Sequence, residues 1–322
     1  MKTWSWLSNK LNAFHRPISH VIKGFSPMAG SQFPGNFNVS GFHDQILKLP
    51  DHPSAIWGID RCLRIREKVD ACHSYVFHMG IFAQSVDLNG DFREPWKDIR
   101  FHVLQKEILD QFFALLNLLG VDHKSLEFTY LAGVNFEGLK KKYYLPEDIV
   151  SKKYLKKLLI KSFPVHSPAN IDAVNIEGAL VGSRLEVASN GIEIGTIVFD
   201  CFKVKKGKLV PINYVGGYAL GMERLLCSVN GGDFIRSIGR YTQAGKKLFK
   251  KVKAVQSILL KDDVLGFLFG TEALACVPDS LARGQKELVR RLKKNLKEYE
   301  INLGLSQKDT DTFITYFKQW KS

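Results

Sequence analysis

The sequence predicts an α+β protein in which an antiparallel β-sheet flanked by helices precedes a basic, helical C-terminal region. Three observations support this prediction. Stretches rich in β-branched and aromatic residues occur in pairs joined by short polar turns, as in β-hairpins. One long amphipathic segment separates two groups of such stretches, and after Gly232 the periodic patterns are helical. Because strands and helices do not alternate along the chain, the pattern disfavours a parallel α/β sheet.

In the first part of the chain we expect an opening helix, a loop, two paired strands and one long helix. The loop covers residues 25–41, which are rich in Gly, Pro and Ser. Residues 55–66 and 74–86 predict two strands around a polar turn. Residues 99–119 predict the clearest helix, because a glycine follows as the C-terminal stop and apolar residues recur on one face. These apolar residues are Leu104, Ile108, Phe112, Leu115 and Leu119.

The next part predicts further strands and then a glycine-rich junction. A strand is expected at 127–131, and residues 192–204 and 209–212 predict a hairpin around a lysine-rich turn. The glycine-rich segment 216–221 then runs directly into a predicted helix at 222–229.

The C-terminal part predicts two amphipathic helices, so we expect two domains, 1–232 and 233–322. The apolar face of the first helix is formed by Leu248, Val252, Val255 and Leu259. The apolar face of the second is formed by Leu288, Leu292, Leu296, Tyr299 and Leu303. The opposite face of this second helix carries Arg290, Arg291, Lys293, Lys294 and Lys297.

The net charge of +14 is concentrated on two segments. Residues 138–161 contribute +6 and residues 233–322 contribute +8, so the rest of the chain is neutral. We interpret the two segments as basic appendages on a neutral body. Clustered positive charge favours a polyanion or an acidic protein as partner, and a merely solvated lysine-rich surface is the alternative.

Several classes of protein are excluded. No stretch approaches the roughly 18 apolar residues that a membrane-spanning helix needs. The five cysteines contain no CxxC pair and the histidines no HExxH, which argues against disulfides and structural zinc. A P-loop, a GxGxxG fingerprint and a GxSxG elbow are also missing. We expect a cytoplasmic protein; the alternative is that the acid-free residues 1–43 form an organellar transit peptide instead of the opening helix.

Two arginine-bearing elements carry the candidate chemistry. Arg64 lies on a predicted strand, and after a polar turn His73 and Phe77 lie on the returning strand. Arg224 lies at the strand-to-helix junction of residues 221–224. An arginine fork binds a phosphate bidentately, an aromatic ring stacks on a purine, and glycines let a ligand approach the backbone. Either arginine alone is typical of an ordinary surface, whereas both together, framed by antiparallel strands, indicate an ATP site without a P-loop.

The order of several motifs resembles the catalytic core of class II aminoacyl-tRNA synthetases of the alanyl type. Residues 37–45 (FNVSGFHDQ) resemble the family's first motif, "FTNAGMNQF". Residues 60–64 (DRCLR) resemble the "SQRCVR" opening of motif 2, and His73, Phe77 and Met79 fit its returning part.

The resemblance continues in the same order further along the chain. Residues 192–199 (IEIGTIVF) are similar to the family's "EIWNLVF". Residues 217–224 (GYALGMER) stand in the place of motif 3, "DTGMGLER". The match is collinear from about residue 10 to about residue 230.

The resemblance implies that residues 1–232 form an adenylating catalytic domain, in which a carboxylate and ATP give an acyl-adenylate and pyrophosphate. It implies that the catalytic Arg64 contacts the α-phosphate of ATP, that Phe77 stacks on adenine, and that the catalytic Arg224 holds the other side of the base and the γ-phosphate. Glu193 is implied as a Mg²⁺ ligand. The other implied ATP-binding residues are His73, Met79, Thr196 and Gly221.

The sequence departs from the family in the amino-acid pocket, which we assign to Glu186, Gly195 and Gly217. Gly217 replaces the aspartate that in the family pairs with the substrate's amino group, so Glu186 or Asp200 is left for that role. Gly195 replaces a tryptophan, which we expect to enlarge or reshape the pocket. The ATP site is therefore kept, whereas the amino-acid site is rebuilt.

Three functions remain open at this point. The chain is a minimal alanyl-type enzyme that charges tRNA, a paralogue that loads a carrier protein or a small-molecule amine, or a non-catalytic accessory relative. We expect tRNA or an acidic carrier protein to bind Arg290, Arg291, Lys293 and Lys294, on one surface with the lysines of 138–161. The sequence identifies neither the amino acid nor the oligomeric state.

Overall fold

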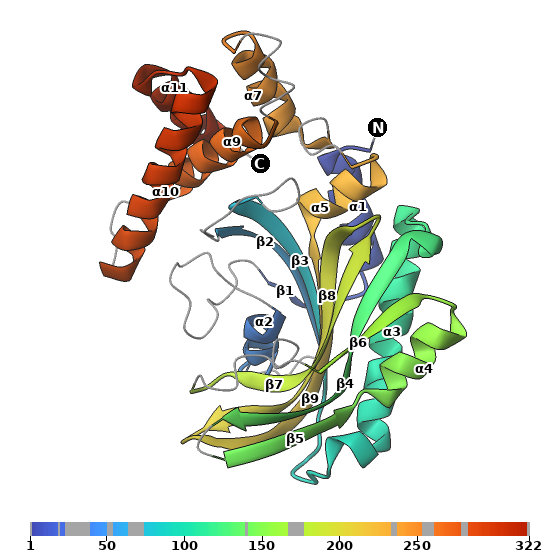
Figure 1. Ribbon diagram of the computed structural model, residues 1–322. Coiled ribbons are helices and arrows are strands. Elements are labelled where there is room, and N and C mark those ends of the chain that lie inside the picture. The colour runs from blue at the N-terminus through green and yellow to red at the C-terminus, as the bar shows by residue number, and fades with distance from the viewer. Residues whose placement is uncertain are drawn as a thin grey trace.

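The centre of the protein is a mainly antiparallel sheet, which confirms the predicted fold class (Figure 1). The computed structural model describes residues 2–18, 20–22, 39–49, 54–63, 74–138, 141–166, 177–232, 237–252, 261–277 and 283–320. Within these ranges nine strands follow the order β1-β2-β3-β9-β8-β7-β4-β5, and β6 pairs with β4. The pairs β1–β2 and β4–β6 are parallel, and the others are antiparallel. The strands are β1 His20–Val21, β2 Ala55–Leu63, β3 Val76–Val86, β4 Leu126–Gly138, β5 Lys141–Glu147, β6 Lys161–Val165, β7 Leu180–Ser189, β8 Ile192–Lys205 and β9 Lys208–Gly221.

Helices flank the sheet on both faces, and the last part of the chain, after β9, is helical. They are α1 Trp4–Phe14, α2 Val39–Ile46, α3 Ile99–Leu119, α4 Ile149–Lys157, α5 Met222–Val229, α7 Gly239–Phe249, α9 Lys261–Cys276, α10 Arg283–Leu303 and α11 Gln307–Gln319, with short 3-10 helices η1 Pro95–Lys97 and η2 His123–Ser125. No helix among the described residues is long and apolar enough to cross a membrane.

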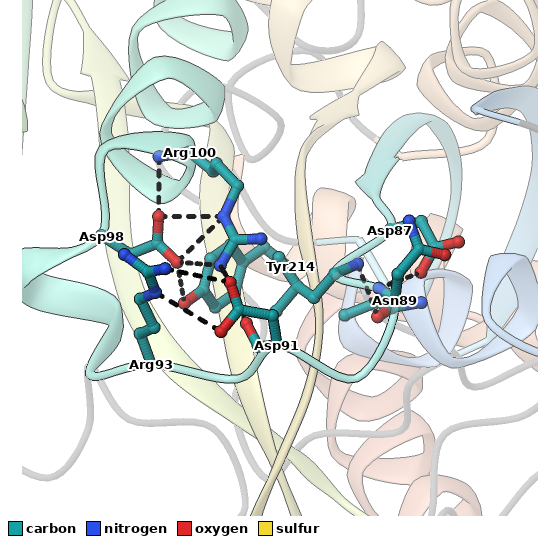
Figure 2. A network of polar contacts seen from close by, with 9 residues as sticks. Asp87, Asn89, Asp91, Arg93, Asp98, Arg100 and Tyr214 are labelled. Atoms are coloured by element: carbon teal, nitrogen blue, oxygen red, sulfur yellow. Dashed lines mark hydrogen bonds and ion pairs between the residues drawn. The ribbon is translucent and has the colours of Figure 1, made fainter.

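Local signals in the sequence fix the ends of α3 as predicted. Gly120 adopts a left-handed conformation (φ 67°) directly after the helix, which a residue without a Cβ does at little cost. At the other end, Asp98 accepts a hydrogen bond from the backbone N–H of Arg100. The Asp98 carboxylate also binds the Arg100 guanidinium (2.7 Å) and accepts the hydroxyl hydrogen of Tyr214 on β9 (Figure 2). The Arg100 hydrogen bond lowers the pKa of Asp98 to about 2, so this clamp between helix and sheet stays charged.

The two faces of the sheet are covered differently. The helices α3 and α4 lie along one face, and α2 lies on the other (Figure 1). The large core under α3 contains Phe112, Phe199 and Tyr218, all fully buried. A smaller core under α2 joins Phe42 to Phe77 and to other apolar residues of β2, β3, β8 and β9.

The interpretation of residues 138–161 as a basic appendage is wrong. Most of this segment forms β5, α4 and the first residue of β6, which are parts of the body. Its apolar residues Leu145 and Leu155 are buried, and the four lysines of α4 are exposed. Lysine-rich sequence therefore marks the exposed face of an amphipathic element here. Figure 1 places α4 and α10 at opposite ends of the molecule, so their lysines do not form the single surface that we expected.

The C-terminal helices differ in detail from the prediction. The helix α7 begins at Gly239 and ends at Phe249, with Leu248 buried. Val255 and Leu259 lie outside the described residues. The helix α10 buries Leu292, Leu296 and Leu303 as predicted. The core that contains Leu226 of α5 continues into α7, α9 and α10, so buried apolar contacts run across the proposed domain boundary at residue 232.

The opening helix α1 is fastened to the sheet by a buried histidine just after its last residue. The Nδ1 of His15 donates to the carbonyl oxygen of Leu11 (2.8 Å), and its Nε2 accepts from the Tyr218 hydroxyl (2.7 Å). Its ring stacks on Trp57 with 3.6 Å between centroids. Burial lowers the pKa of His15 to about 4, because the cost of burying an imidazolium charge outweighs the hydrogen bond to Leu11, which raises this pKa.

We predict that His15 makes the protein sensitive to mild acid. The unfolded chain takes up the proton near pH 6.5, whereas the folded chain takes it up only near pH 4, so stability falls as the pH drops through this window. The loss between pH 7 and pH 4.5 should be about 2–3 kcal/mol. Urea unfolding at both pH values, for wild type and His15→Gln, measures it. An equal pH dependence in the two proteins would contradict the prediction.

Candidate functional site

The candidate site is built around the junction between β9 and α5. Gly221 ends the strand and is the N-cap of the helix, as the sequence predicted. A Cβ at Gly221 would lie 2.8 Å from Nε of Arg224, so the glycine lets the arginine fold back over the strand end. Arg224 thereby points toward the sheet and is only 8% exposed.

Three of the predicted ATP-site residues meet at this junction. The guanidinium carbon of Arg224 lies 5.6 Å from the ring centroid of Phe77 on β3. Its Nη1 donates to Oε1 of Glu193 on β8 at 2.6 Å. The Glu193 side chain is 41% exposed, whereas that of Arg224 is only 9% exposed, so the buried guanidinium needs an anion beside it and solvent reaches the carboxylate that fills this role.

An irregularity in the sheet directs Glu193 toward Arg224. The register between β7 and β8 shifts so that Val187 faces Gly195 but Ala188 faces Glu193. The extra residue, Ile194, turns into the large core under α3. Such a bulge changes the face on which the following residues lie, and Glu193 consequently lies on the side of Phe77 and Arg224. The alternation of apolar and polar residues in the sequence does not show where a bulge occurs, so it cannot predict the face on which Glu193 lies.

Of the remaining predicted ATP-site residues, some lie on this face of the sheet and others lie outside the described residues. Met79 is the cross-strand partner of Gly221, two residues beyond Phe77 on the same face. Thr196 pairs with Ala219 one row further, and its hydroxyl donates to the carbonyl oxygen of Leu185. Arg64 and His73 lie outside the described residues.

Cross-strand pairing places Thr196 in a row of residues that crosses the sheet from β2 to β7. It runs from Gly58 through Ile81, Ala219 and Thr196 to Glu186. Glu186 is the one carboxylate in this row, and its side chain is 36% exposed. Nη1 of Arg184 lies 3.6 Å from its Oε1. The middle of this row is buried, with Ile81 0% and Ala219 1% exposed, whereas Thr196 and Glu186 are partly exposed.

The other two predicted pocket residues, Gly195 and Gly217, leave no open space. A Cβ at Gly195 would lie 2.4 Å from the carbonyl oxygen of Ala219. A Cβ at Gly217 would lie 2.2 Å from the carbonyl oxygen of Phe82 and 2.6 Å from Nε2 of His43. The expectation that a glycine at 195 enlarges the pocket is therefore wrong, because neighbouring backbone fills the space.

The imidazole against Gly217 belongs to a buried pair that sequence reasoning missed. Nδ1 of His43, on α2, lies 2.7 Å from Oδ2 of Asp200 on β8, and neither side chain is exposed. Asp200 was one of two candidates for binding a substrate amine. With its carboxylate enclosed by His43, it is inaccessible to a substrate in this structure, which leaves Glu186. The only sequence signal was that His43 lies in the segment that resembles motif 1.

A second buried network lies beneath the junction. Glu223, next to Arg224, is fully buried and accepts hydrogen bonds from the backbone N–H and Nδ1 of His78, both at 2.8 Å. Arg240 on α7 donates to Glu223 (3.0 Å) and contacts Glu272 on α9 (2.7 Å). Burial alone would raise the pKa of Glu223, but Arg240 and His78 outweigh it and lower this pKa to about 2. Burial raises the pKa of Glu272, which accepts a hydrogen bond from the Tyr241 hydroxyl.

A separate cavity, lined in part by charged side chains, lies away from this junction. It has about 1030 Å³ and lies between η1, α3, β5 and α4. Its buried acid, Asp148, is fully engaged with Gln105, Ser151 and Ser183. No cluster of three metal-ligating side chains occurs within the described ranges. We therefore place the candidate site at the junction of β9 and α5.

The basic C-terminal helices present two charged features. On α10, the predicted acceptor-binding residues Arg290, Arg291, Lys293 and Lys294 are all exposed, but both arginines pair with Glu287. A groove of about 680 Å³ between α7 and α11 is lined by Lys247, Lys250, Lys251 and Lys308. The Lys247 ammonium lies 4.3 Å from the centre of the Tyr316 ring in this groove.

The chain is similar to solved structures at low sequence identity. No protein-family model matches the sequence, and no curated protein sequence matches it. Two structures of a pyrrolysyl-tRNA synthetase from Desulfitobacterium hafniense are 12% identical to the chain; they have TM-scores of 0.40 and 0.42 and cover 72% and 73% of this chain and 70% and 72% of theirs. An Entamoeba histolytica asparaginyl-tRNA synthetase in complex with asparaginyl-adenylate is 11% identical, with a TM-score of 0.42, over 73% of this chain and 64% of that chain. Superpositions this loose carry no argument about function, which has to be argued from the site.

We predict that Gly217 cannot be replaced. In Gly217→Ala the added methyl group would collide with the backbone of β3 and with His43, so the variant should lose about 1–3 kcal/mol of stability. Gly239→Ala is the matched control, because a Cβ there meets no atom within 4 Å. Thermal unfolding of both variants measures the difference. Equal melting temperatures would show that the space at Gly217 is not closed.

Proposed function

We propose that this chain uses ATP to activate an amino acid as its adenylate and transfers it to an acceptor, as a ligase resembling alanyl-type class II aminoacyl-tRNA synthetases. The observation that carries the proposal is the position of the Arg224 guanidinium over the Phe77 ring, beside Glu193, at the end of an antiparallel sheet. A cation and an aromatic ring facing each other make a slot for a purine that bears phosphates.

The slot has to open slightly to admit adenine. A base between two flat groups needs ~7 Å, twice the ~3.5 Å of a stacking contact, against the observed 5.6 Å. Arg224 therefore has to move by more than an ångström, which requires giving up its Glu193 partner. Because Arg224 is only 9% exposed, its guanidinium needs an anion beside it, and a bound triphosphate would replace the partly exposed Glu193 carboxylate in this role.

The chemistry needs no protein nucleophile. A carboxylate oxygen of the amino acid bonds to the α-phosphorus while the bond from phosphorus to the pyrophosphate oxygen breaks. Arg224, with Arg64 in the proposed second arginine position, stabilises the charge that develops on the phosphates. An acceptor hydroxyl or amine then attacks the acyl carbon, AMP leaves, and the acceptor's proton is released.

We further propose that Glu193, together with the ATP phosphates, holds Mg²⁺. One exposed carboxylate suits this ion, which binds proteins through one or two acids and completes its shell with phosphates and water. When bound, the ion neutralises phosphate charge. The displacement of Arg224 described above would break its ion pair with Glu193 and turn this side of the carboxylate toward the ion.

For the amino acid, we propose that Glu186 binds the ammonium group. Gly217 has no carboxylate and Asp200 is enclosed, so Glu186 is the exposed acid in the row of Thr196. The pocket thus differs from that of the alanyl type, and alanine is expected to be a poor substrate. This difference is also what favours the second candidate function, a paralogue that loads a carrier protein or a small-molecule amine.

We predict that Arg224→Ala lowers adenylate formation at least 100-fold, since loss of one preorganised charge donor costs about 3 kcal/mol in the transition state. The measurement is exchange of labelled pyrophosphate into ATP, first with wild type and each amino acid in turn. Arg93→Ala is the matched control, an exposed arginine that pairs with Asp91 (Figure 2). Exchange at the wild-type rate in a folded Arg224→Ala protein would refute the assigned role.

The acceptor is proposed to bind the basic face of α10. We predict that neutralising Arg290, Arg291, Lys293 and Lys294 weakens binding of tRNA and flattens its salt dependence, by about one unit of log–log slope per lost phosphate contact. The control with the same charge change is neutralisation of Lys152, Lys153, Lys156 and Lys157 on the distant α4. Adenylate formation should not change in either variant. Equal losses in both variants would mean that only net charge matters, and this result would contradict the assignment.

A further inference from the structure

Two buried carboxylates meet one buried arginine where the C-terminal helices contact the sheet. Arg240 of α7 is 6% exposed and lies between Glu223 of α5 and Glu272 of α9. It also lies over the ring of Tyr241, 4.7 Å from its centre. Removing charges from water is expensive unless the partners are held in good geometry. The position of Arg240 is therefore tightly specified by the three elements around it.

This network holds the backbone on both sides of Phe77. Nη2 of Arg240 donates to the carbonyl oxygen of Val76 (3.3 Å). The backbone N–H of His78 donates to Glu223, which itself accepts from Arg240. In a strand successive side chains alternate, so Val76 and His78 face the network while Phe77 faces the site.

The same network also holds the residue before Arg224. Glu223 lies in the first turn of α5, and its position fixes how that turn approaches β3. Thus one guanidinium group ties together the chain segments that carry the Phe77 ring and the Arg224 side chain.

We infer that Arg240 is a positioning residue that sets the spacing between Phe77 and Arg224, the two walls of the adenine slot. The inference rests on the function proposed above. It means that the C-terminal region, beyond any role in binding the acceptor, is part of the ATP site's construction. It also means that residues 1–232 alone would bind ATP poorly.

The test uses full-length protein and two variants. Arg240→Lys keeps the charge but cannot bridge two acids and a carbonyl oxygen at once. The triple variant Arg240→Met, Glu223→Gln, Glu272→Gln removes the three charges together, so that none is left buried without its partner, and the glutamine oxygens still accept hydrogen bonds from His78 and Tyr241. We expect the triple variant to remain folded, with a melting temperature near that of wild type, and both variants to bind ATP at least tenfold more weakly. The kcat at saturating ATP should change less than the KM for ATP.

A folded triple variant that binds ATP with wild-type affinity would overturn the inference. Amide hydrogen exchange without ATP gives a readout that is independent of activity. Arg240→Lys should accelerate exchange in 76–79 and 222–225 and leave 126–131 of β4 unchanged, whereas uniform acceleration would mean that Arg240 only stabilises the fold. If wild-type protein does not bind ATP, the proposed function fails, and the exchange pattern alone decides whether Arg240 positions these segments.

Discussion

The pairing of β3 with β9 is the constraint on which the site depends. These strands are distant in the sequence, and their register places Met79 opposite Gly221. The Phe77 ring therefore lies beside the helix that starts at Met222, and Arg224 in its first turn reaches over the ring. A shift by one residue would turn Phe77 to the other face and separate the two groups. Sheet, glycine junction and helix thus act together to place one cation over one aromatic ring.

The face of the sheet that packs against α2 also carries the candidate site. On one side α2 covers the sheet and encloses the His43–Asp200 pair against Gly217. On the other side the face carries Arg224, Glu193, Thr196 and Glu186, of which the two acids are partly exposed. The buried pair explains why position 217 is a glycine: no side chain fits between His43 and β3. The glycine is thus required by packing, and the amino-acid anchor that we propose, Glu186, lies on another strand.

Much of the fold could be predicted because its signals are local. The ends of α3 follow from Asp98 and Gly120, and the start of α5 follows from the glycine-rich end of β9. The fold class follows from the hairpin pattern. By contrast, the positive charge of residues 138–161 led to the wrong prediction of a basic appendage. Lysines on an amphipathic helix are equally compatible with an appendage and with the outer face of the body.

The site could be predicted only in part, for a physical reason. Phe77, Glu193 and Arg224 were found because they lie in motifs, and the structure brings them together. The partners of His43 and Glu223 were missed, because a buried polar residue is paired by tertiary contact and its partner leaves no mark nearby in the sequence. Arg240 is the clearest case: in the sequence it is one of many basic residues in the tail, whereas in the structure it is buried between two acids. The bulge at Ile194, which redirects Glu193, is equally invisible to alternation.

The central claim is that ATP binds between Phe77 and Arg224, and the most direct measurement is a crystal structure of the full chain with a non-hydrolysable ATP analogue. The account predicts adenine stacked on the Phe77 ring, with the Arg224 guanidinium on the opposite side of the base and its contact to Glu193 broken. Density for the analogue in the cavity beside Asp148 or in the α7–α11 groove, with Arg224 still paired to Glu193, would contradict it.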